Sequence, residues 1–569
     1  MKSRRVPTPR PSPGSALRLS LRELFSPFAW RSPVFIGLLC AAAAIPVLFA
    51  LYTHLAWEDF LITYRYSENL ARGHGLVYTA GERVYGFTSP LNTLLPALFA
   101  FATAAKDFTL PLWLFRGVSL AGLIFAWVSI ESVFSRGTAG SRIRFLVGCL
   151  FPVIAALEIK STAFAMSGQE AGLVLGFLAP AFAIAILGWA PHRILGGVLF
   201  AGLLYSRPDA FVYMAAIALA ALAFESGPRR PLVVALAQSV LISVLLYLPW
   251  LLFAWLYYGS PIPHTVIAKH NLVAYAPDGY GLTAALVAGF HSAPSVISRA
   301  LAPIYDMLNS GPGSWPVWMH DAELLLELVA FLYWLVPSRD RLGRMASLAS
   351  FVLLGYLIYT DLASEYSPWY YPPLAFLSLV TLASAAATLA ERAAQPALRY
   401  VFSAAMVSGL LFFLGFIFFS SLAPIRFKEE VIDGGQRRQI GLWLKAHVAP
   451  NETVYLEPLG YIGYYSGCRI ADWPGLVSPA VVEARKKIGP AKNYFTWGEV
   501  AEAIKPSWIV ARANESEFIA RSDYLDHHYE LMAVFDDRKA IDQLGAKATA
   551  RGMNISYPEA IFGVYHRVD

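Results

Sequence analysis

Charged side chains are scarce in this sequence. Asp, Glu, Lys and Arg together make up 15% of its 569 residues, whereas an average soluble chain carries about a quarter. Hydrophobic residues account for 57% of the chain. Burying that much apolar surface in a water-soluble core would require an unusually large interior. The composition therefore favours a membrane protein, with lipid as the solvent for most of the chain.

Cysteine is also rare, which excludes two kinds of structural crosslink. Cys40 and Cys149 lie in apolar stretches, and Cys468 stands alone in the more polar C-terminal region. No CxxC pair and no Cys/His spacing typical of zinc occurs, so we expect neither a disulfide nor a structural zinc. Lys and Arg exceed Asp and Glu by only 45 to 39. Because the basic residues sit in short loops between apolar runs, they favour membrane lipid headgroups as partners over nucleic acid.

The first 33 residues lack apolar runs. We expect no cleavable signal peptide, because about 30 polar and mixed residues precede the first apolar run and no small-residue cleavage site follows. The segment is basic and rich in Pro and Ser. We therefore expect residues 1–33 to form a disordered tail in the cytoplasm.

Long apolar runs fill residues 34–424, and they predict a polytopic α-helical membrane domain. Orientation follows from Lys and Arg, which gather in cytoplasmic loops. The run 90–104 is expected to be re-entrant or interfacial, because a crossing there would place Arg142 and Arg144 outside. We expect about 11 crossings in all. They lie near 34–53, 110–134, 145–160, 171–190, on either side of Arg207-Pro208-Asp209, near 231–257, between the external loop 258–320 and Arg339, and near 345–361, 370–389 and 399–423.

Charged residues return in the last region, 425–569. Alternating runs at 453–456 and 507–511 predict buried strands, and stretches at 434–447 and 499–505 predict helices. We expect a small α/β domain on the side opposite the N-terminus. In a bacterial inner membrane with a cytoplasmic N-terminus, that side is the periplasm.

The polar loop after the first span, residues 54–109, is the most informative stretch. If residues 58–70 are helical, Glu58, Arg65 and Asn69 share a face with Ile62, and Asp59 lies beside them. An acidic pair near a cation is suited to deprotonating a hydroxyl and holding a phosphate. A surface helix with solvated charges fits the same spacing. The spacing alone leaves the two interpretations open.

The sequence E-D-F-L-I-T-Y-R-Y at residues 58–66 resembles the first-loop signature of GT-C class membrane glycosyltransferases. The similarity is greatest to the branch of arabinofuranosyltransferases, which typically read D-D-x-F-I-T-x-R-Y. Glu58 stands where the family usually has Asp, and His264 and Ala171 replace its usual Asn and Thr. Further matches follow in chain order: Ser167-Gly168-Gln169-Glu170, Arg207-Pro208-Asp209, Tyr257-Tyr258-Gly259 with Pro263-His264-Thr265 and Lys269, Pro368-Trp369-Tyr370-Tyr371, Gly460 to Ser466, and Asp472 to Leu476.

The predicted threading places all these motifs on one side of the membrane, and it was derived without them. Each motif alone also has a simpler interpretation. Arg207-Pro208-Asp209 suits a tight turn with a helix cap. Trp369 and Tyr370 suit the aromatic belt at a membrane surface.

The resemblance implies an inverting glycosyltransferase, which moves a sugar such as the pentose arabinofuranose from a polyprenyl-phosphate donor to an extracytoplasmic glycan or lipid acceptor. Asp59 or Glu58 would be the catalytic base, with Asp59 favoured. The implied cations for the donor phosphate are Arg65, Lys269 and Arg207. The implied substrate-binding residues are Tyr66, Glu170, His264, Trp369 and Tyr370.

Two other functions remain open from the sequence. A transporter or flippase of a lipid-linked sugar would place ionisable groups near the bilayer midplane and often has repeated halves. This sequence shows no internal repeat, and its acidic residues cluster at one predicted face. A non-catalytic scaffold would leave the acidic pair without a purpose. Glu58, Asp59 and Glu170 offer oxygen ligands for a divalent cation, but no spacing demands a metal or another cofactor.

Overall fold

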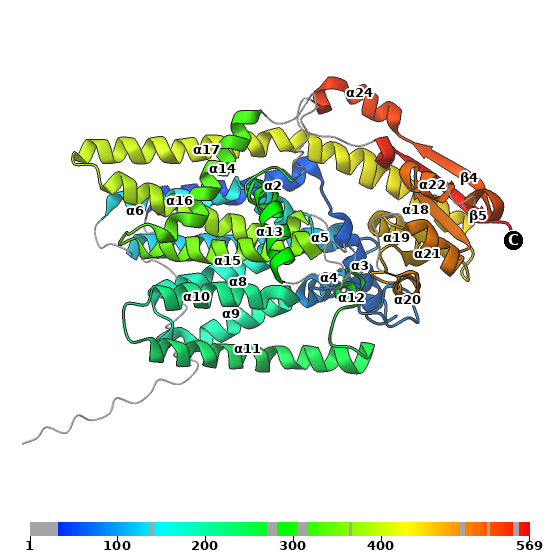
Figure 1. Cartoon of the computed structure of the whole chain (residues 1–569), viewed down its shortest axis with the longest axis horizontal. Coiled ribbons are helices and arrows are strands. Elements are labelled where there is room, and N and C mark those ends of the chain that lie inside the picture. Colours follow the sequence, from blue (N-terminus) through cyan, green and yellow to red (C-terminus); the bar gives the residue numbers. More distant parts are fainter. Residues whose placement is uncertain are drawn as a thin grey trace, which may run out of the picture.

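Figure 1 shows the chain as a computed structural model. It describes residues 32–136, 141–269, 282–304, 316–363, 367–489, 496–520, 524–549 and 557–569. The basic tail predicted over residues 1–33 lies outside these ranges except for Ser32 and Pro33. Most helices run along one long axis as a bundle, and a small sheet with its own helices lies at one end of that bundle (Figure 1).

The bundle carries the membrane-spanning part of the chain. Within the described ranges, six helices are long and apolar enough to cross a bilayer: α2, α5, α11, α15, α16 and the helix that begins with α17. The protein is therefore a multi-pass membrane protein, and the count of about 11 crossings stays a prediction. The bounds are α2 (Pro33–Thr53), α5 (Thr109–Arg136), α6 (Arg142–Ala156), α7 (Ile159–Met166), α8 (Ala171–Leu187), α9 (Arg193–Ser206), α10 (Phe211–Ala223), α11 (Arg229–Tyr258), α13 (Leu282–Ile297), α14 (Val317–Leu332), α15 (Arg341–Ala363), α16 (Pro372–Glu391) and α17 (Pro396–Phe427).

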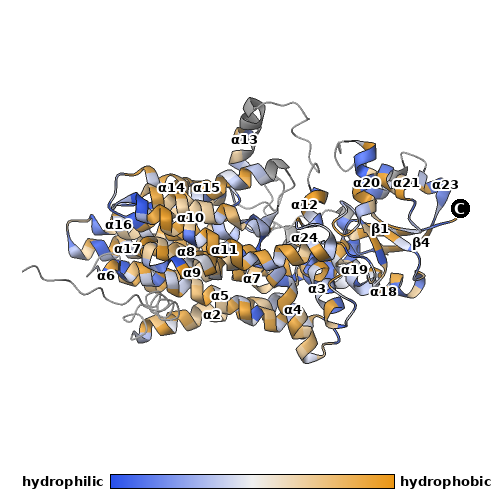
Figure 2. Ribbon diagram, turned by 90° about the horizontal axis from the view of Figure 1, so that it is seen from below, coloured by the Kyte–Doolittle hydropathy of each residue, from blue (hydrophilic) through white to orange (hydrophobic). Residues whose placement is uncertain are grey.

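The outer surface of the bundle is apolar. Figure 2 shows hydrophobic residues along the lengths of the bundle helices. On α11, for example, Val233, Leu241, Leu245, Leu252 and Leu256 are all exposed. A continuous apolar surface of this kind would be unfavourable in water, and it suits contact with lipid tails.

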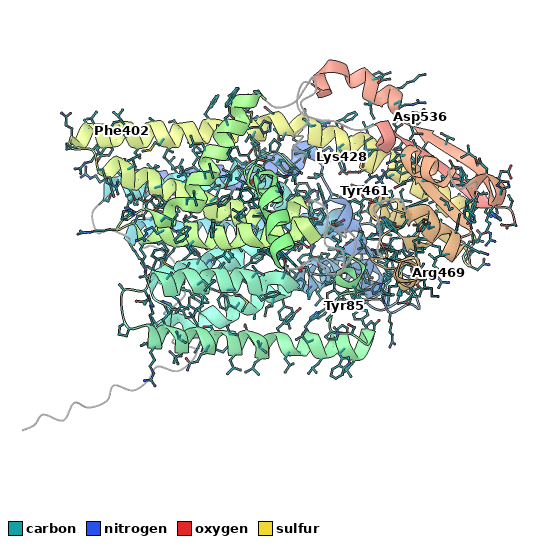
Figure 3. All side chains as sticks on the ribbon, in the orientation of Figure 1. Tyr85, Phe402, Lys428, Tyr461, Arg469 and Asp536 are labelled. Atoms are coloured by element: carbon teal, nitrogen blue, oxygen red, sulfur yellow. The ribbon has the colours of Figure 1, made fainter. Side chains whose placement is uncertain are left out.

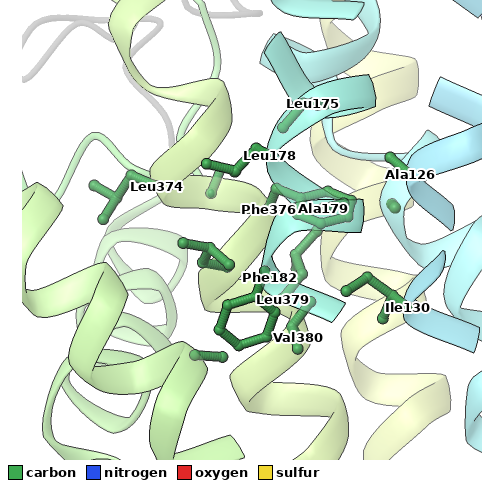
Figure 4. Close-up of a cluster of buried hydrophobic side chains, with 14 of the residues drawn as sticks. Ala126, Ile130, Leu175, Leu178, Ala179, Phe182, Leu374, Phe376, Leu379 and Val380 are labelled. Atoms are coloured by element: carbon green, nitrogen blue, oxygen red, sulfur yellow. The ribbon is translucent and has the colours of Figure 1, made fainter. Parts of the chain in front are cut away.

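Three helices meet in the centre of the bundle. Figure 4 shows Ile130 of α5, Phe182 of α8 and Phe376 of α16 among the buried side chains there. The helices α5 and α8 approach closely because glycines face each other. A Cβ added to Gly176 would lie 2.8 Å from the Cα of Gly122. Small residues at a helix interface allow the close backbone contact that holds helices together in a membrane.

Several predicted spans have breaks or short helices. The helix predicted near 145–160 ends at Ala156, and α7 begins after Glu158, whose carboxylate accepts hydrogen bonds from the Lys160 and Ser161 amides. The chain also breaks at Arg207 between α9 and α10, where η3 (Pro208–Ala210) intervenes. The helix α4 (Pro90–Thr103) has 14 residues. At 1.5 Å per residue it is about 21 Å long, too short to cross a bilayer core of about 30 Å alone.

The C-terminal domain is an α/β unit with a five-stranded sheet of order β2-β1-β3-β5-β4. β1 pairs in parallel with β2 and β3, whereas β5 pairs antiparallel with β3 and β4. The α17 helix continues into this domain through a π-helical segment, η6 (Lys428–Arg437). The remaining elements are α18 (Arg438–His447), β1 (Thr453–Leu456), α19 (Leu459–Ser466), β2 (Arg469–Asp472), α20 (Pro479–Ile488), α21 (Thr496–Ile504), β3 (Trp508–Arg512), α22 (Ala513–Ala520), α23 (Tyr524–His528), β4 (Tyr529–Asp536), α24 (Arg538–Thr549), η8 (Tyr557–Ala560) and β5 (Ile561–Arg567).

Candidate active site

A cavity of about 340 Å³ lies where the bundle meets the C-terminal domain. Its wall comes from α3 (Glu58–Ala71), the segment leading into α4, the breaks before α8 and α10, α12 (His264–Lys269), α15 and η5 (Pro368–Tyr370), with Leu476 from the C-terminal domain. Figure 3 marks this junction by Tyr85 and Tyr461, and Phe402 lies at the far end of the bundle. Six of the ten predicted site residues line the cavity: Asp59, Glu170, Arg207, Lys269, Trp369 and Tyr370.

Asp59 stands in the first turn of α3 and faces the cavity. The helix begins here because the Trp57 amide donates to the Ser167 carbonyl at 2.9 Å, which fixes the chain just before the first turn. Acidic residues in a first turn are favoured by the helix dipole. Burial raises the pKa of Asp59, and the nearby Lys269 opposes that rise. A carboxylate with a raised pKa is a stronger base when it is ionised.

Glu58 points away from the cavity toward the C-terminal domain. Its carboxylate is ion-paired with Arg437 of η6, and it accepts a hydrogen bond from the Gly460 amide at 3.2 Å. Burial raises the pKa of Glu58 to about 7, although Arg437 acts to lower it. The two adjacent carboxylates thus have different surroundings. Of the two, only Asp59 lines the cavity.

Arg207 enters the cavity wall with its charge already compensated. Its guanidinium lies 2.5 Å from a Glu170 oxygen and 2.8 Å from an Asp209 oxygen, and it stacks 4.1 Å above the Tyr370 ring. The Tyr356 hydroxyl donates to the second Asp209 oxygen at 2.6 Å. Two carboxylates for one guanidinium leave this group with a formal negative charge. It is suited to bind sugar hydroxyls, and it does not offer the free cation that the sequence led us to expect for phosphate.

Lys269 remains as the cation suited to an anion in this cavity. It ends α12, and its ammonium group lies 5.4 Å from the centre of the Trp369 ring. Trp369 in turn meets Trp57 edge to face at 6.0 Å. Among the described residues, no carboxylate forms a salt bridge with Lys269. An ammonium held against an aromatic face keeps its three donors free for a ligand.

Arg65 and Tyr66 do not reach the cavity. Arg65 is buried, and it donates to the backbone carbonyls of Gly463, Gly467 and Cys468 in the C-terminal domain. The Tyr66 hydroxyl donates to the Val84 carbonyl at 3.0 Å. Both side chains are occupied by backbone groups, so the predicted phosphate role of Arg65 and substrate role of Tyr66 find no support in this geometry. They hold α3 in place.

His264 also lies outside the cavity lining, although it starts the helix that carries Lys269. Its amide donates to the Tyr85 carbonyl at 2.6 Å, which ties α12 to the first external loop. The next residue, Thr265, does line the cavity. The cavity lining on α12 thus comes from residues after His264, and the substrate role expected for His264 stays a prediction.

Several cavity residues were not predicted. Gln169 and Asp209 sit inside motifs that pointed to the site, so the signal was present. The side-chain amide oxygen of Asn92 (Oδ1) is buried in the wall without a hydrogen-bond partner among the described residues. Tyr356 lies on α15 in a stretch that matches no motif. Its role becomes visible only through its contact with Asp209.

The cavity carboxylates are dispersed. In the part of the chain that the structure describes, no three His, Cys, Asp or Glu side chains are grouped to hold a metal ion. Glu170 is committed to Arg207, and Glu58 to Arg437.

The fold matches that of a known membrane protein. The crystal structure of ArnT from Cupriavidus metallidurans bound to undecaprenyl phosphate superposes with a TM-score of 0.51 and 12% identity, covering 88% of this chain and 96% of that chain. Its apo state gives the same TM-score and covers 95% of that chain. The chain thus has the GT-C fold that its motifs indicated, with a small C-terminal sheet.

Two curated relatives point to a narrower group. A terminal β-(1→2)-arabinofuranosyltransferase from Corynebacterium glutamicum is 32% identical over 236 residues, which is 37% of this chain and 32% of the relative. The protein of the same name from Mycobacterium tuberculosis is 28% identical over 223 residues, or 37% of this chain and 34% of the relative. The matched part thus spans about a third of each relative. The resemblance to the arabinofuranosyltransferase-like branch is confirmed.

The C-terminal domain has a match of its own. A family described as a domain of unknown function, DUF8728, covers residues 427–555. This range begins where α17 ends and includes η6 and the first four strands of the sheet. The description assigns no activity to that domain.

Proposed function

We propose that this protein is an inverting glycosyltransferase. It moves a sugar, such as a pentose of the arabinofuranose type, from a polyprenyl-phosphate donor to a glycan or lipid acceptor outside the cytoplasm. The observation that carries the proposal is the presence of a half-buried carboxylate, Asp59, and a cation without a salt bridge among the described residues, Lys269, in a single cavity. The names of the two relatives and the fold shared with ArnT support the same activity.

The proposed reaction uses these two groups in one displacement. Asp59 takes the proton from an acceptor hydroxyl as that oxygen bonds to the anomeric carbon. The bond from the anomeric carbon to the phosphate oxygen breaks on the opposite face, and its electron pair leaves with the polyprenyl phosphate. Lys269 stabilises the charge on that phosphate. A phosphate monoester is a good leaving group, so no acid is required to protonate it.

The remaining wall is suited to hold the sugar. Gln169, Glu170, Asp209 and Asn92 present hydrogen-bonding groups, and Trp369 presents an apolar ring. The cavity volume lies at the low end of the range for ligand pockets, about 300–1,000 Å³. It suits a sugar phosphate, with the polyprenyl tail extending out into the bilayer.

The predicted membrane topology also favours an enzyme. The predicted domains are a cytoplasmic tail (1–33), a membrane domain (34–424) and a periplasmic α/β domain (425–569), and the cavity opens on the periplasmic side. The helices α3 and α12, which line the cavity, lie at the end of the bundle next to the sheet (Figure 1). A transporter or flippase would have its ionisable groups midway along the helices. The placement therefore favours the enzyme.

The test is transfer of radiolabelled sugar by the purified protein from a panel of polyprenyl-phosphate sugars, with wild type and Asp59→Asn side by side. We expect transfer from one donor, which identifies the sugar, and a rate lower by about 10²–10⁴ in the variant, the range for loss of a general base. If no donor supports transfer but lipid-linked sugar crosses proteoliposome membranes, the protein is a transporter.

A further inference from the structure

The helix that carries Lys269 is short and is held from two sides. α12 has six residues, and its first amide, that of His264, donates to the Tyr85 carbonyl. At its other end the Ala268 carbonyl, one residue before Lys269, accepts a hydrogen bond from Arg485 at 2.7 Å. A helix of six residues has little stability of its own. Its place in the cavity wall therefore depends on such external contacts.

Arg485 belongs to α20 of the C-terminal domain, and its side chain is fixed. It is 8% exposed, and the nitrogen that binds Ala268 also donates to the Pro474 carbonyl at 2.8 Å. The guanidinium lies 5.1 Å from the Trp473 ring centre. Among the described residues, no carboxylate forms a salt bridge with it. Burying an arginine without a carboxylate partner costs folding free energy. The hydrogen bonds to the two carbonyls offset part of that cost.

The segment that supports Arg485 also forms part of the cavity. The Asp472 carboxylate accepts hydrogen bonds from the amides of Gly475, Leu476 and Val477, which fixes the turn. Leu476 lines the cavity. A Cβ added to Gly86 would lie 2.9 Å from Val477 Cγ1 and 3.0 Å from the Leu476 carbonyl oxygen, so a side chain there would force this segment to shift. The C-terminal domain and the first external loop thus meet directly beside the cavity.

We propose that Arg485 is a positioning residue for Lys269, so that the C-terminal domain takes part in binding the donor phosphate. The hydrogen bond from Arg485 to Ala268 fixes the end of α12 and directs the Lys269 ammonium into the cavity beside Asp59. This inference rests on the proposed function, in which Lys269 binds the phosphate. It assigns a purpose within the reaction to a domain whose family description gives none.

The experiment measures binding of undecaprenyl phosphate to the purified full-length protein. The variants are Lys269→Gln, Arg485→Gln, Arg485→Lys and the double variant Lys269→Gln/Arg485→Gln. Lys487→Gln is the matched control, because Lys487 is an exposed cation on the same helix. We expect Lys269→Gln and Arg485→Gln each to weaken binding about tenfold or more, the loss for a hydrogen bond to a charged group. Lys487→Gln should bind as wild type does.

Two further readouts separate positioning from general damage. The double variant should bind no more weakly than Lys269→Gln alone, because Arg485 acts through Lys269. Arg485→Lys should restore part of the affinity, since an ammonium can still reach a carbonyl. With the donor as the varied substrate, Arg485→Gln should lower kcat/KM, and by no more than Lys269→Gln does, because Arg485 acts through Lys269.

The outcomes distinguish the two proposals. If the wild type does not bind undecaprenyl phosphate, the proposed function fails. If the wild type binds it and Lys269→Gln weakens binding while Arg485→Gln does not, the role of Arg485 is refuted and the proposed function stands. Additive losses in the double variant would likewise refute positioning, because they would show that the two residues act independently.

Discussion

The two sides of α3 differ in what surrounds them, although both carry charge. The side with Glu58 and Arg65 lies against the C-terminal domain, where each charge is met by a fixed partner. The side with Asp59 and Thr63 faces the cavity, where Asp59 has no fixed ion pair among the described residues. Neighbouring residues of a helix point about 100° apart. Of two adjacent carboxylates, Glu58 can therefore stabilise the fold, and Asp59 is the one available to a ligand in the cavity.

The strongest test of this contrast exchanges each carboxylate for its amide. Asp59→Asn should lower kcat by about 10²–10⁴, because the remaining cavity carboxylates, Glu170 and Asp209, are ion-paired with Arg207. Glu58→Gln should change kcat by less than about tenfold, because Glu58 lies outside the cavity. Single-turnover transfer of radiolabelled sugar measures both rates. Comparable losses in the two variants would show that both carboxylates serve the reaction.

The side of α3 that carries Glu58 should contribute to the stability of the folded protein. Arg437 is 3% exposed at its side chain and is paired with Glu58 and Asp433. Removing one partner of a buried ion pair costs about 3–5 kcal/mol. We therefore expect Arg437→Gln to lower the melting temperature in detergent. Arg438→Gln, the matched control at an exposed neighbouring position, should leave it close to wild type.

A double variant that removes the unpaired carboxylate gives a control for that experiment. Adding Glu58→Gln to Arg437→Gln removes the carboxylate that the first change left unpaired. The double variant should therefore melt above Arg437→Gln alone. A melting temperature unchanged by Arg437→Gln would show that the pair contributes nothing to holding α3 against the domain.

The smallest effect concerns the pH at which activity is lost. Asp59 must be ionised to accept a proton, so the rate falls as the pH drops through the pKa of Asp59. Lys269 lowers that pKa and Glu457 raises it. Lys269→Gln should therefore move the acid limb of kcat/KM to higher pH, and Glu457→Gln should move it to lower pH. Glu58→Gln should leave the acid limb at the same pH. A shift in that variant would show that the charge of Glu58 affects the pKa of Asp59.

Local patterns in the sequence predicted much of the fold. The helix expected at 58–70 is α3, and the strand expected at 453–456 is β1. Of the face predicted from Glu58, Ile62, Arg65 and Asn69, three residues make fixed contacts away from the cavity, whereas Ile62 lines it. These features follow from spacing along one element, which a sequence contains directly.

What surrounds such a face could not be predicted. Arg65 binds carbonyls about 400 positions along the chain, at Gly463 and Gly467, and no local pattern reports that contact. The charge of Arg207 is compensated by Glu170, which is 37 residues away in sequence. A motif shows that a cation is present, but only the folded chain shows whether a carboxylate from a distant part of the sequence forms an ion pair with it.

The cavity takes its walls from opposite ends of the chain, with Asp59 near the beginning and Leu476 near the end. Chains are synthesised from the N-terminus, and domains fold as they emerge. Asp59 and the first helices are therefore in the membrane long before Leu476 and Arg485 leave the ribosome. The part of the wall at Leu476 and the hydrogen bond from Arg485 to α12 are therefore added last. A protein shortened before its final domain would keep most of the residues that line the cavity, but it would lack Leu476 and the hydrogen bond from Arg485 that holds α12.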